Sequence, residues 1–376
     1  MYPNCFPMKI LMDLTYINPK ETAGVTNYSY RLLEGFKQCG LEKNIILLVT
    51  PQNSRTISEQ VAGFRQIILS LRSIGAIPHL TGILNKKRVN RLISLYNFDI
   101  FFSPYIAFHG LYTTKIMSIG VCHDAQGFSL KHNKLKQFAY NFFSRHILRK
   151  QTAVVTISYS AQQDIAQKIP SIKNRIKVIY NSILPISNIQ RNNSLFPPYI
   201  LNVNTLEPYK NLITLVKAFA ILKNKIPHSL YVKAKRRPYW DNIVYPFIKK
   251  EKIEDRVLLI EQQYSEAEMA SLYKNASLFV SPSLMEGFGF TPIEAALYEV
   301  PVICNKESAL YETTKGLLNY YEPGTDEYAL SRMMYQILTS PNLDLASIAK
   351  TYEMAYSVKR QAQDFIALFN TVLSMS

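Results

Sequence analysis

Two carboxylates that flank a pair of glycines form the segment of this chain best suited to chemistry. Glu286 and Glu294 enclose Gly287 and Gly289 in the run EGFGFTPIE. Glycine lets a ligand approach the backbone closely, and a helix that begins after such a loop presents free N–H groups and the positive end of its dipole. The segment therefore predicts a site for an anion such as a phosphate or a diphosphate.

The elements around this segment are the ones that such a site needs. Residues 276–281 are mostly apolar and predict a short buried strand. Thr291 is a good helix N-cap, Pro292 fits the first helical position, and Glu294 falls where a capping-box carboxylate would stand. In the plainest alternative, Glu294 only caps this helix and Glu286 is a solvated loop residue. The residues between them favour the binding site.

The run Glu-Gly-Phe-Gly with a second glutamate in the following helix resembles the signature of retaining glycosyltransferases of family 4, which have the GT-B fold. In that family the first glutamate holds the donor sugar and the second holds the ribose of the nucleotide. The resemblance therefore implies these roles for Glu286 and Glu294. It also implies that the loop and helix start between them contact the donor: Gly287, Phe288, Gly289, Phe290 and Thr291.

A second segment with the family's pattern follows the strand expected at residues 199–203. Residues 202–211 resemble the family run G-x-L-x-P-R-K-N, in which the lysine neutralises the departing diphosphate, and Lys210 takes that position. A fixed cation stabilises the growing negative charge of the leaving group more in the transition state than in the ground state. A solvated loop lysine is the alternative for Lys210.

This second segment also departs from the family. Asn204 stands where glycine is expected, and Thr205 and Tyr209 stand where arginine is common. We therefore expect the diphosphate site to be one cation short. Lys235 and Arg236, after the next expected strand, are the candidates for the missing charge, with a solvated basic turn as the alternative.

The first half of the chain carries two further matches to the family. His123 and Asp124 follow a strand expected at residues 116–122, where many relatives carry His-Asp. The resemblance places His123 near the acceptor hydroxyl and the donor sugar, where an imidazole can take or relay a proton or hydrogen-bond the sugar. A structural histidine oriented by Asp124 is the alternative. Gly24, in a loop expected at residues 22–26, resembles the family's backbone loop near the donor phosphate.

Strand-like runs alternate with helical patterns through both halves of the chain, which predicts parallel, doubly wound sheets. A stretch rich in Pro and Asn predicts a linker. The expected parts are a first Rossmann-like domain over residues 1–186, a linker at 187–198, a second such domain at 199–355, and a C-terminal helix at 356–376 that packs back toward the first domain. The resemblance implies the GT-B arrangement, in which the two domains face each other across a cleft.

Composition and cysteine spacing indicate the cellular compartment and the need for a cofactor. The chain has 376 residues and 4 cysteines without metal-site or disulfide-framework spacing, and its start does not resemble a signal peptide. We therefore expect a cytoplasmic protein without a membrane span. No Asp-x-Asp pair occurs in the sequence, so we expect no metal and no other cofactor, the nucleotide sugar being a substrate.

Positive charge is concentrated in the first half. The net charge is +16, and residues 60–163 hold thirteen Lys or Arg against two acids. This predicts an anionic partner. Apolar residues at 64, 67, 68 and 71 predict a helix over residues 60–73. We find no nucleic-acid-binding motif. Relatives in the family use lipid-linked acceptors, so the resemblance favours an anionic membrane as the partner, with the protein peripheral on the inner face of the cell membrane.

Together these features predict a bacterial hexosyltransferase. It would move a hexose from GDP-mannose or a UDP-hexose to a lipid-linked oligosaccharide acceptor, with retention, in O-antigen (lipopolysaccharide) or capsule biosynthesis. Two alternatives stay open. One is another enzyme of the same fold, such as a sugar-nucleotide epimerase or a phosphorylase. The other is a non-catalytic protein of this fold that binds a sugar nucleotide or a membrane surface.

Overall fold

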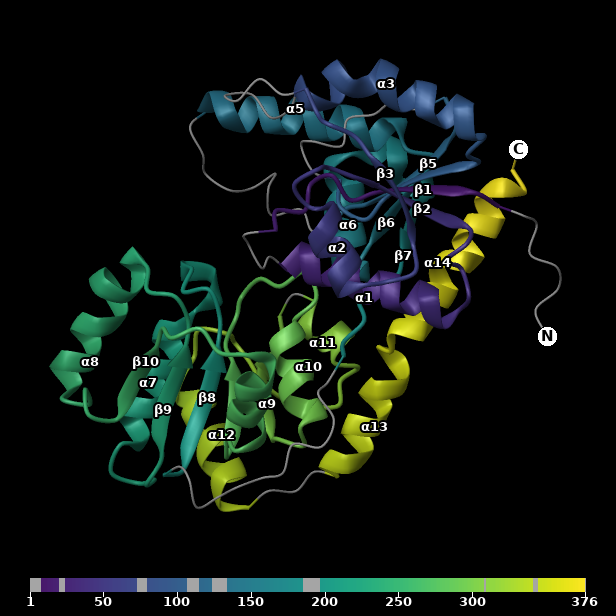
Figure 1. Ribbon diagram of the computed structural model, residues 1–376. Coiled ribbons are helices and arrows are strands. Elements are labelled where there is room, and N and C mark those ends of the chain that lie inside the picture. Colours follow the sequence, from purple (N-terminus) through teal and green to yellow (C-terminus); the bar gives the residue numbers. More distant parts are fainter. Residues whose placement is uncertain are drawn as a thin grey trace. The chain divides into compact units, whose positions relative to one another are not determined.

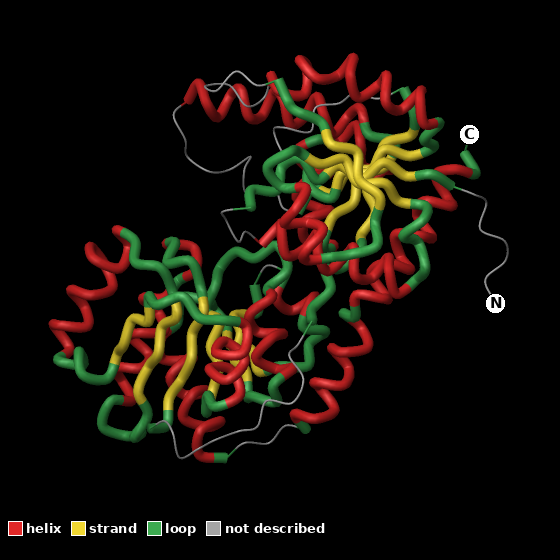
Figure 2. Tube along the Cα trace, in the orientation of Figure 1, coloured by secondary structure: helices red, strands yellow, loops and turns green. Residues whose placement is uncertain are grey.

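The computed structural model divides the chain into two compact units, which Figures 1 and 2 show as ribbon and tube. The first comprises Met1–Ser182 and Tyr356–Ser376, and the second comprises Ile183–Ala355. The predicted linker at 187–198 lies almost wholly outside the described residues. The structure describes residues 8–19, 24–72, 80–106, 115–123, 134–184, 197–307, 309–340 and 344–375.

The first unit is built on a seven-stranded sheet of parallel strands in the order β3-β2-β1-β4-β5-β6-β7. Its central strands are fully buried apolar runs, as expected of a parallel sheet covered by helices on both faces. The strands are β1 (Ile10–Asp13), β2 (Ile45–Val49), β3 (Arg65–Ile68), β4 (Ile100–Ser103), β5 (Met117–Val121), β6 (Ala153–Thr156) and β7 (Ile176–Val178).

Edge strand β3 corrects one prediction. The helix predicted over residues 60–73 is wrong: helix α2 (Ser54–Gln60) ends where that segment begins, and Arg65–Ile68 pairs with β2. The remaining helical elements of this unit are α1 (Gly24–Gln38), α3 (Leu80–Tyr96), α5 (Lys134–Lys150), α6 (Tyr159–Lys168), the 3₁₀ turn η1 (Pro170–Arg175) and α14 (Val358–Leu373).

Adjacent residues of β4 show how the two faces of this sheet are covered. Phe101 packs with Val89 and Ile93 of α3 on one face. Phe102 points the other way, because successive side chains of a strand alternate. Its ring lies 5.1 Å from that of Phe365 in α14, measured between centroids. Helix α14, from the end of the chain, is therefore part of the core of the first unit.

The second unit has a six-stranded parallel sheet in the order β10-β9-β8-β11-β12-β13. Its strands are β8 (Tyr199–Val203), β9 (Ser229–Lys233), β10 (Val257–Ile260), β11 (Leu278–Ser281), β12 (Val302–Asn305) and β13 (Asn319–Tyr321). Its helical elements are η2 (Pro208–Lys210), α7 (Leu212–Leu222), η3 (Trp240–Val244), α8 (Tyr245–Glu251), α9 (Glu266–Lys274), α10 (Phe290–Leu297), α11 (Leu310–Thr313), α12 (Glu327–Thr339) and α13 (Leu345–Ala355).

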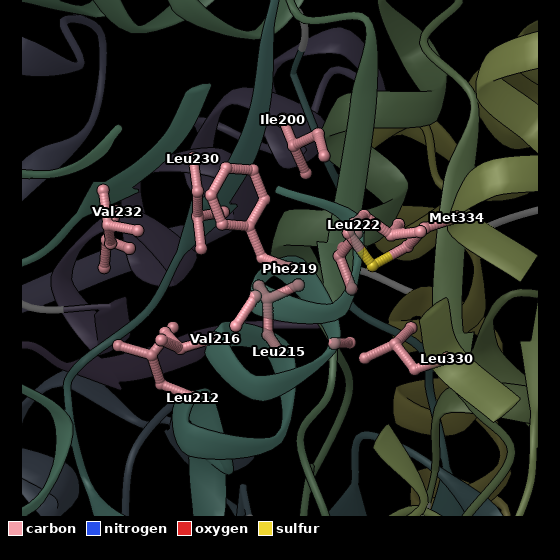
Figure 3. Close-up of a cluster of buried hydrophobic side chains, with 14 of the residues drawn as sticks. Ile200, Leu212, Leu215, Val216, Phe219, Leu222, Leu230, Val232, Leu330 and Met334 are labelled. Carbon is pink, nitrogen blue, oxygen red and sulfur yellow. The ribbon is translucent and has the colours of Figure 1, made fainter. Parts of the chain in front are cut away.

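Helix α7 carries the core of the second unit. Most of its residues are buried, so the helix packs on the sheet and also on α12. Figure 3 shows this cluster, which includes Leu212, Leu215, Val216, Phe219 and Leu222 of α7, Ile200, Leu230 and Val232 of the sheet, and Leu330 and Met334 of α12.

One glycine sets the distance between α1 and α14. A Cβ added at Gly35 would lie 2.2 Å from the carbonyl oxygen of Val358, which is backbone and cannot rotate away. We expect Gly35→Ala to lower the free energy of unfolding by about 2–3 kcal/mol, because the two helices must separate. Gly24→Ala, in the same helix with nothing within 4 Å of the added Cβ, should cause no loss. Equilibrium urea unfolding measures both, and equal stabilities would contradict the argument.

Candidate functional site

The structure brings Lys210 and Glu286 into direct contact. The Nζ atom of Lys210 lies 2.7 Å from Oε1 of Glu286, and the two side chains are only 16% and 14% exposed. Lys210 ends η2, which follows β8, and Glu286 follows β11, the neighbouring strand. Both side chains thus stand at the carboxyl edge of the sheet, where ligands bind in open α/β folds.

Asn211 fixes the position of Lys210. It adopts a left-handed backbone conformation with φ 56°, so the chain turns sharply from η2 into α7. Its side-chain amide donates to the carbonyl oxygens of Pro282, at 3.1 Å, and Gly324, at 2.8 Å. Its Oδ1 accepts a hydrogen bond from Thr214 at 2.8 Å. One buried asparagine therefore ties η2 to the loop after β11.

The ion pair determines what an anion near Lys210 would meet. A pair that is largely removed from water is costly to break by deleting one partner, because the remaining charge stays uncompensated. Any anion that approaches Lys210 has to compete with Glu286 for the same ammonium group. Burial and the nearby Glu286 charge raise the pKa of the Cys304 thiol, which stays neutral beside the pair.

Helix α10 begins two residues earlier than predicted. Gly289 is its N-cap, with φ 84°, and Phe290 is the first helical residue, without a side-chain cap. The prediction of Thr291 as N-cap, with Pro292 first and Glu294 in a capping box, is therefore wrong. The reason is that a glycine in the left-handed conformation starts the helix without needing a side-chain acceptor.

Glu294 has a partner other than its own helix end. Its Oε2 accepts a hydrogen bond from the hydroxyl of Tyr273 at 2.9 Å. Burial, with the Glu294 charge as the next cause, raises the pKa of Tyr273 well above its ordinary value, so this hydroxyl stays protonated and can donate. The carboxylate is thus oriented from α9, the neighbouring helix.

The glycine loop has a tight fit on one side. A Cβ added at Gly289 would lie 2.5 Å from Leu310, so close packing and positive φ both require glycine there. Phe288 is 2% exposed and its carbonyl accepts from Thr313, so this residue belongs to the core. Only its backbone is available to a ligand, whereas Gly287 is partly exposed.

The candidates for a second cation differ in their surroundings. Arg236 pairs with Asp241 at 3.3 Å, and Arg237 pairs with Glu207 at 2.9 Å. Lys235 is exposed, and no ion pair of it is recorded in the part of the chain that the structure describes. Of these side chains, Lys235 is the one whose charge is available to an anion.

Asn204, which replaces the expected glycine, braces its own loop. Its Oδ1 accepts from the backbone N–H of Leu206 at 2.6 Å, and its amide donates to Asn202. Asn202 in turn donates to the carbonyl of Val280 in β11 at 2.8 Å. The backbone of Asn204 has no positive φ, so the position does not require glycine.

In the first unit, His123 stands just beyond β5 with a defined ring orientation. Its Nε2 lies 3.0 Å from the carbonyl oxygen of Pro104. A carbonyl only accepts, so Nε2 carries the hydrogen and Nδ1 is the basic nitrogen of the neutral ring. The ring of Tyr28 contacts it edge-on at 4.5 Å between centroids. Asp124, predicted beside it, lies outside the described residues.

Gly24 begins helix α1 instead of lying in a loop. The loop predicted at residues 22–26 is therefore wrong from Gly24 onward, because the helix starts there. An added Cβ would meet nothing within 4 Å. Its predicted contact with the donor stays a prediction.

Sequence analysis missed a buried carboxylate at the end of β1. Asp13 is 0% exposed; its Oδ1 accepts from the N–H and the hydroxyl of Thr15, at 3.0 and 2.7 Å. Its Oδ2 has no hydrogen-bond partner among the described residues, nor does the hydroxyl of Tyr28. Burial raises the pKa of Asp13 to about 6. A single Asp after an apolar run gives no pattern from which this could be predicted.

No metal site is found among the described residues, in which no three His, Cys, Asp or Glu side chains gather closely enough to hold an ion. The expected absence of a cofactor stays a prediction.

The raised pKa of Asp13 makes a testable statement about stability. The pKa of this carboxyl is 3.8 in the unfolded chain and about 6 in the folded protein, so the buried ionised carboxylate lowers the free energy of unfolding above about pH 6. This lowering is complete above about pH 6, disappears as the pH falls toward 4, and amounts to roughly 3 kcal/mol. We expect the stability gained by Asp13→Asn to be larger at about pH 8 than at about pH 4.5.

Urea unfolding across this pH range measures the effect. Asp164→Asn, at an exposed carboxylate of the same unit, is the matched control and should show no such pH dependence. A stability difference between Asp13→Asn and wild type that does not change with pH would contradict the assignment.

Comparison with known proteins places this geometry in a family. The model of Glycosyltransferase Family 4 matches residues 22–184, and that of Glycosyl transferases group 1 matches residues 187–354. The O-antigen chain mannosyltransferase RfbU of Salmonella typhimurium is 27% identical over 206 residues, which are 54% of this chain and 56% of that protein. The O-antigen chain mannosyltransferase B of Escherichia coli is 26% identical over 41% of this chain and 40% of that protein.

The chain thus aligns with only about half the length of these curated relatives, while solved structures match it from end to end. Sucrose-phosphate synthase from Thermosynechococcus elongatus has a TM-score of 0.75 at 16% identity, covering 98% of this chain and 100% of that chain. Anabaena Alr3699/HepE in complex with UDP and glucose has a TM-score of 0.72 at 14% identity, covering 97% and 100%. The chain therefore belongs to the glycosyltransferases of group 1 and family 4, and it has the GT-B fold.

Proposed function

We propose that this protein is a retaining glycosyltransferase that moves a hexose from a nucleotide sugar to a lipid-linked oligosaccharide in O-antigen or capsule biosynthesis. The observation that carries the proposal is the Lys210–Glu286 ion pair at the carboxyl edge of the second sheet, next to the glycine loop that starts α10. GDP-mannose and a UDP-hexose are the donors considered. The names of the O-antigen relatives favour mannose as the hexose.

The second unit supplies the donor site in this proposal. The N–H groups at the start of α10 and the ammonium of Lys210 bind the diphosphate, because both present positive charge to it. Glu294, held by Tyr273, accepts a hydrogen bond from the ribose. Lys235 is the second cation near the phosphates. Tyr209, which replaces an arginine of the family, lies with its ring 5.4 Å from Nζ of Lys210.

The proposed reaction follows from these placements. As the glycosidic bond breaks, Lys210 stabilises the negative charge that grows on the diphosphate, and Glu286 offsets the positive charge at the anomeric carbon. The acceptor hydroxyl attacks from the face that the diphosphate leaves, and the leaving oxygen helps to take its proton, so the configuration is retained. His123 acts on the acceptor side as a hydrogen-bond partner or proton relay.

The structure leaves the non-catalytic alternative with less support. It was motivated by Asn204, Thr205 and Tyr209 in place of family residues. Asn204 is a bracing residue with a relaxed backbone, and Lys210 is held as a catalytic cation would have to be. Slow hydrolysis of a nucleotide sugar by the purified protein would separate the enzyme from a binder.

We also propose that the first unit rests on an anionic membrane through α3 and α5. The strand register places Leu11 and Phe101, which α3 covers, on the same face of the sheet as Val154, which α5 covers. Figure 1 shows both helices on the same side of the sheet. The exposed face of α3 carries Leu84, Lys87, Arg91 and Leu95 at helical spacing, and α5 exposes Phe142, Arg145 and Arg149. Among the described residues, no helix is both long and apolar enough to cross a membrane.

The donor site generates the first prediction of this proposal. Glu286→Gln should lower turnover by roughly 10²–10³-fold, as expected for loss of a charge that stabilises the transition state. The same change should leave the affinity for free GDP or UDP unchanged or tighter, because Lys210 no longer has a competing carboxylate. Lys210→Ala should lower both the turnover and the affinity for free GDP or UDP. Glu294→Gln should weaken nucleotide binding. Calorimetry with GDP and UDP, together with donor hydrolysis, measures these effects.

Glu251→Gln is the matched control, because Glu251 pairs with Lys223 at 3.6 Å in the same unit, in a partly exposed pair. This control should change neither the turnover nor the affinity for GDP or UDP. Weaker nucleotide binding by Glu286→Gln than by wild type would refute the competition between Glu286 and the diphosphate. Unimpaired turnover of Lys210→Ala would refute the role of the cation.

The membrane surface generates a second prediction. Replacing Lys87 and Arg91 with Gln should reduce partition onto vesicles containing anionic lipid by roughly 10–30-fold, since each basic residue near such a surface contributes about 1 kcal/mol. Lys249 and Lys250, changed to Gln together, remove the same charge from α8 and should have little effect. Vesicle sedimentation at low and high salt measures partition. Equal binding to neutral and anionic vesicles, or an equal loss in both double variants, would count against this surface.

A further inference from the structure

We propose that Asn305, which ends β12, is a positioning residue of the donor site, and that its buried amide holds the loop that carries Glu286. The proposal rests on the proposed function, because it names a residue on which the geometry of that site depends. Asn305 acts on Glu286 through the backbone of Ser283 and supplies no charge of its own.

Consecutive residues of the loop between β11 and Glu286 are held by groups from other elements. The carbonyl oxygens of Pro282 and Ser283 and the N–H of Leu284 bind, in that order, Nδ2 of Asn211 at 3.1 Å, Nδ2 of Asn305 at 3.1 Å and the carbonyl oxygen of Tyr209 at 2.9 Å. The hydroxyl of Ser283 also donates to the carbonyl oxygen of Met285 at 3.0 Å, just before Glu286. The loop is therefore fixed residue by residue up to the carboxylate.

The side chain of Asn305 supports this loop from inside the core. Asn305 is 0% exposed, and β12 pairs with β11, so the amide lies beside the loop that follows β11. Its Nδ2 donates to Ser283, while its Oδ1 accepts from the N–H of Glu307 at 3.3 Å. A buried position that needs a donor and an acceptor at once suits an amide. An apolar side chain would take this bond from the carbonyl oxygen of Ser283, a buried residue, and such a loss is costly.

Gly324 connects this amide to the turn that carries Lys210. A Cβ added at Gly324 would lie 2.5 Å from Nδ2 of Asn305, so the amide occupies the space that a side chain would fill. The carbonyl oxygen of the same glycine accepts from Asn211 at 2.8 Å. Both asparagines therefore rest on one glycine, which relates the turn of Lys210 to the loop of Glu286.

Position decides how much Glu286 contributes to the proposed reaction. A charge stabilises a transition state best when it is already held where the opposite charge develops, because nothing then has to reorganise at the moment of reaction. A displacement of about 1 Å can cost on the order of 100-fold in rate. Loss of the Asn305 amide would free the loop at Ser283, so its effect on the rate should pass through Glu286.

The test removes the amide in two ways. Asn305→Ala deletes it, whereas Asn305→Asp keeps the shape and the accepting oxygen and replaces only the donor. Asn319→Ala and Asn319→Asp are the matched controls, because Asn319 begins β13 and its amide donates to the carbonyl oxygen of Val302, at the other end of β12, at 3.0 Å. Tyr321→Phe is a milder variant, since it removes only a hydroxyl that donates to the carbonyl oxygen of Gly324 at 3.0 Å.

Three quantities are measured for each variant, and the changes at Asn305 and Asn319 are also made in a Glu286→Gln background. The first is turnover in the hydrolysis of GDP-mannose and of UDP-glucose. The second is the calorimetric affinity for GDP and UDP, and the third is amide hydrogen exchange of residues 282–286 by mass spectrometry. Equilibrium urea unfolding establishes that each variant is folded.

We expect both Asn305 variants to lower turnover about tenfold, as for the loss of one well-made hydrogen bond, and Tyr321→Phe to lower it less. The affinity for GDP or UDP should be unchanged or tighter, as expected for Glu286→Gln. In the Glu286→Gln background the Asn305 changes should lower turnover by less than about twofold further, because a residue that acts through another has little effect once that one is altered. Exchange of residues 282–286 should be faster, and the Asn319 variants should behave as wild type.

Wild-type turnover in the Asn305 variants, an equal loss in the Asn319 variants, or the full tenfold loss in the Glu286→Gln background would overturn the inference and leave the proposed function intact. If the Asn305 variants do not fold, Tyr321→Phe decides, and wild-type turnover and exchange in that variant would overturn the inference. Hydrolysis of no nucleotide sugar by the wild type would instead count against the proposed function. Amide exchange of residues 282–286 would in that case still decide whether Asn305 holds the loop.

Discussion

The ion pair between Lys210 and Glu286 is the interaction on which the candidate site of the second unit depends. Each charge would be unfavourable alone in so dry a position, and together they are tolerated only with a fixed geometry. That geometry comes from Asn211, whose amide reaches two carbonyls of neighbouring loops, and from parallel strands that end at the same edge. The pair keeps the ammonium group of Lys210 in place at this edge of the sheet.

In the first unit, by contrast, not every buried polar group at the sheet edge is paired. Oδ2 of Asp13 and the hydroxyl of Tyr28 have no hydrogen-bond partner among the described residues. Away from that edge, the rings of Phe36, Phe102 and Phe365 pack together and join α1 and α14 to the sheet.

Much of the donor site could be predicted because its residue types leave few structural choices. For glycines before a helix and a lysine after a strand, the local sequence predicts the same arrangement that the folded unit shows. The exact start of α10 could not be predicted, because both Gly289 and Thr291 can cap a helix, and the left-handed conformation of Gly289 begins it two residues earlier. Strand β3 was mistaken for a helix because Phe64, Ile67 and Ile68 satisfy the helical period by chance. The burial of Asp13 depends on distant elements, which leaves no local pattern.

At two departures from the family pattern, the side chain that is present makes contacts of its own. A glycine at the position of Asn204 would give a flexible loop, whereas Asn204 fastens the loop to Asn202 and so to β11. At Tyr209 an arginine's charge is lost, but the ring lies beside the ammonium of Lys210 and still helps to place it. In both cases the new side chain makes a contact of its own within the site's loops. The position of Lys210 then rests on how rigidly its turn is held, and Asn211 holds that turn through two carbonyl oxygens.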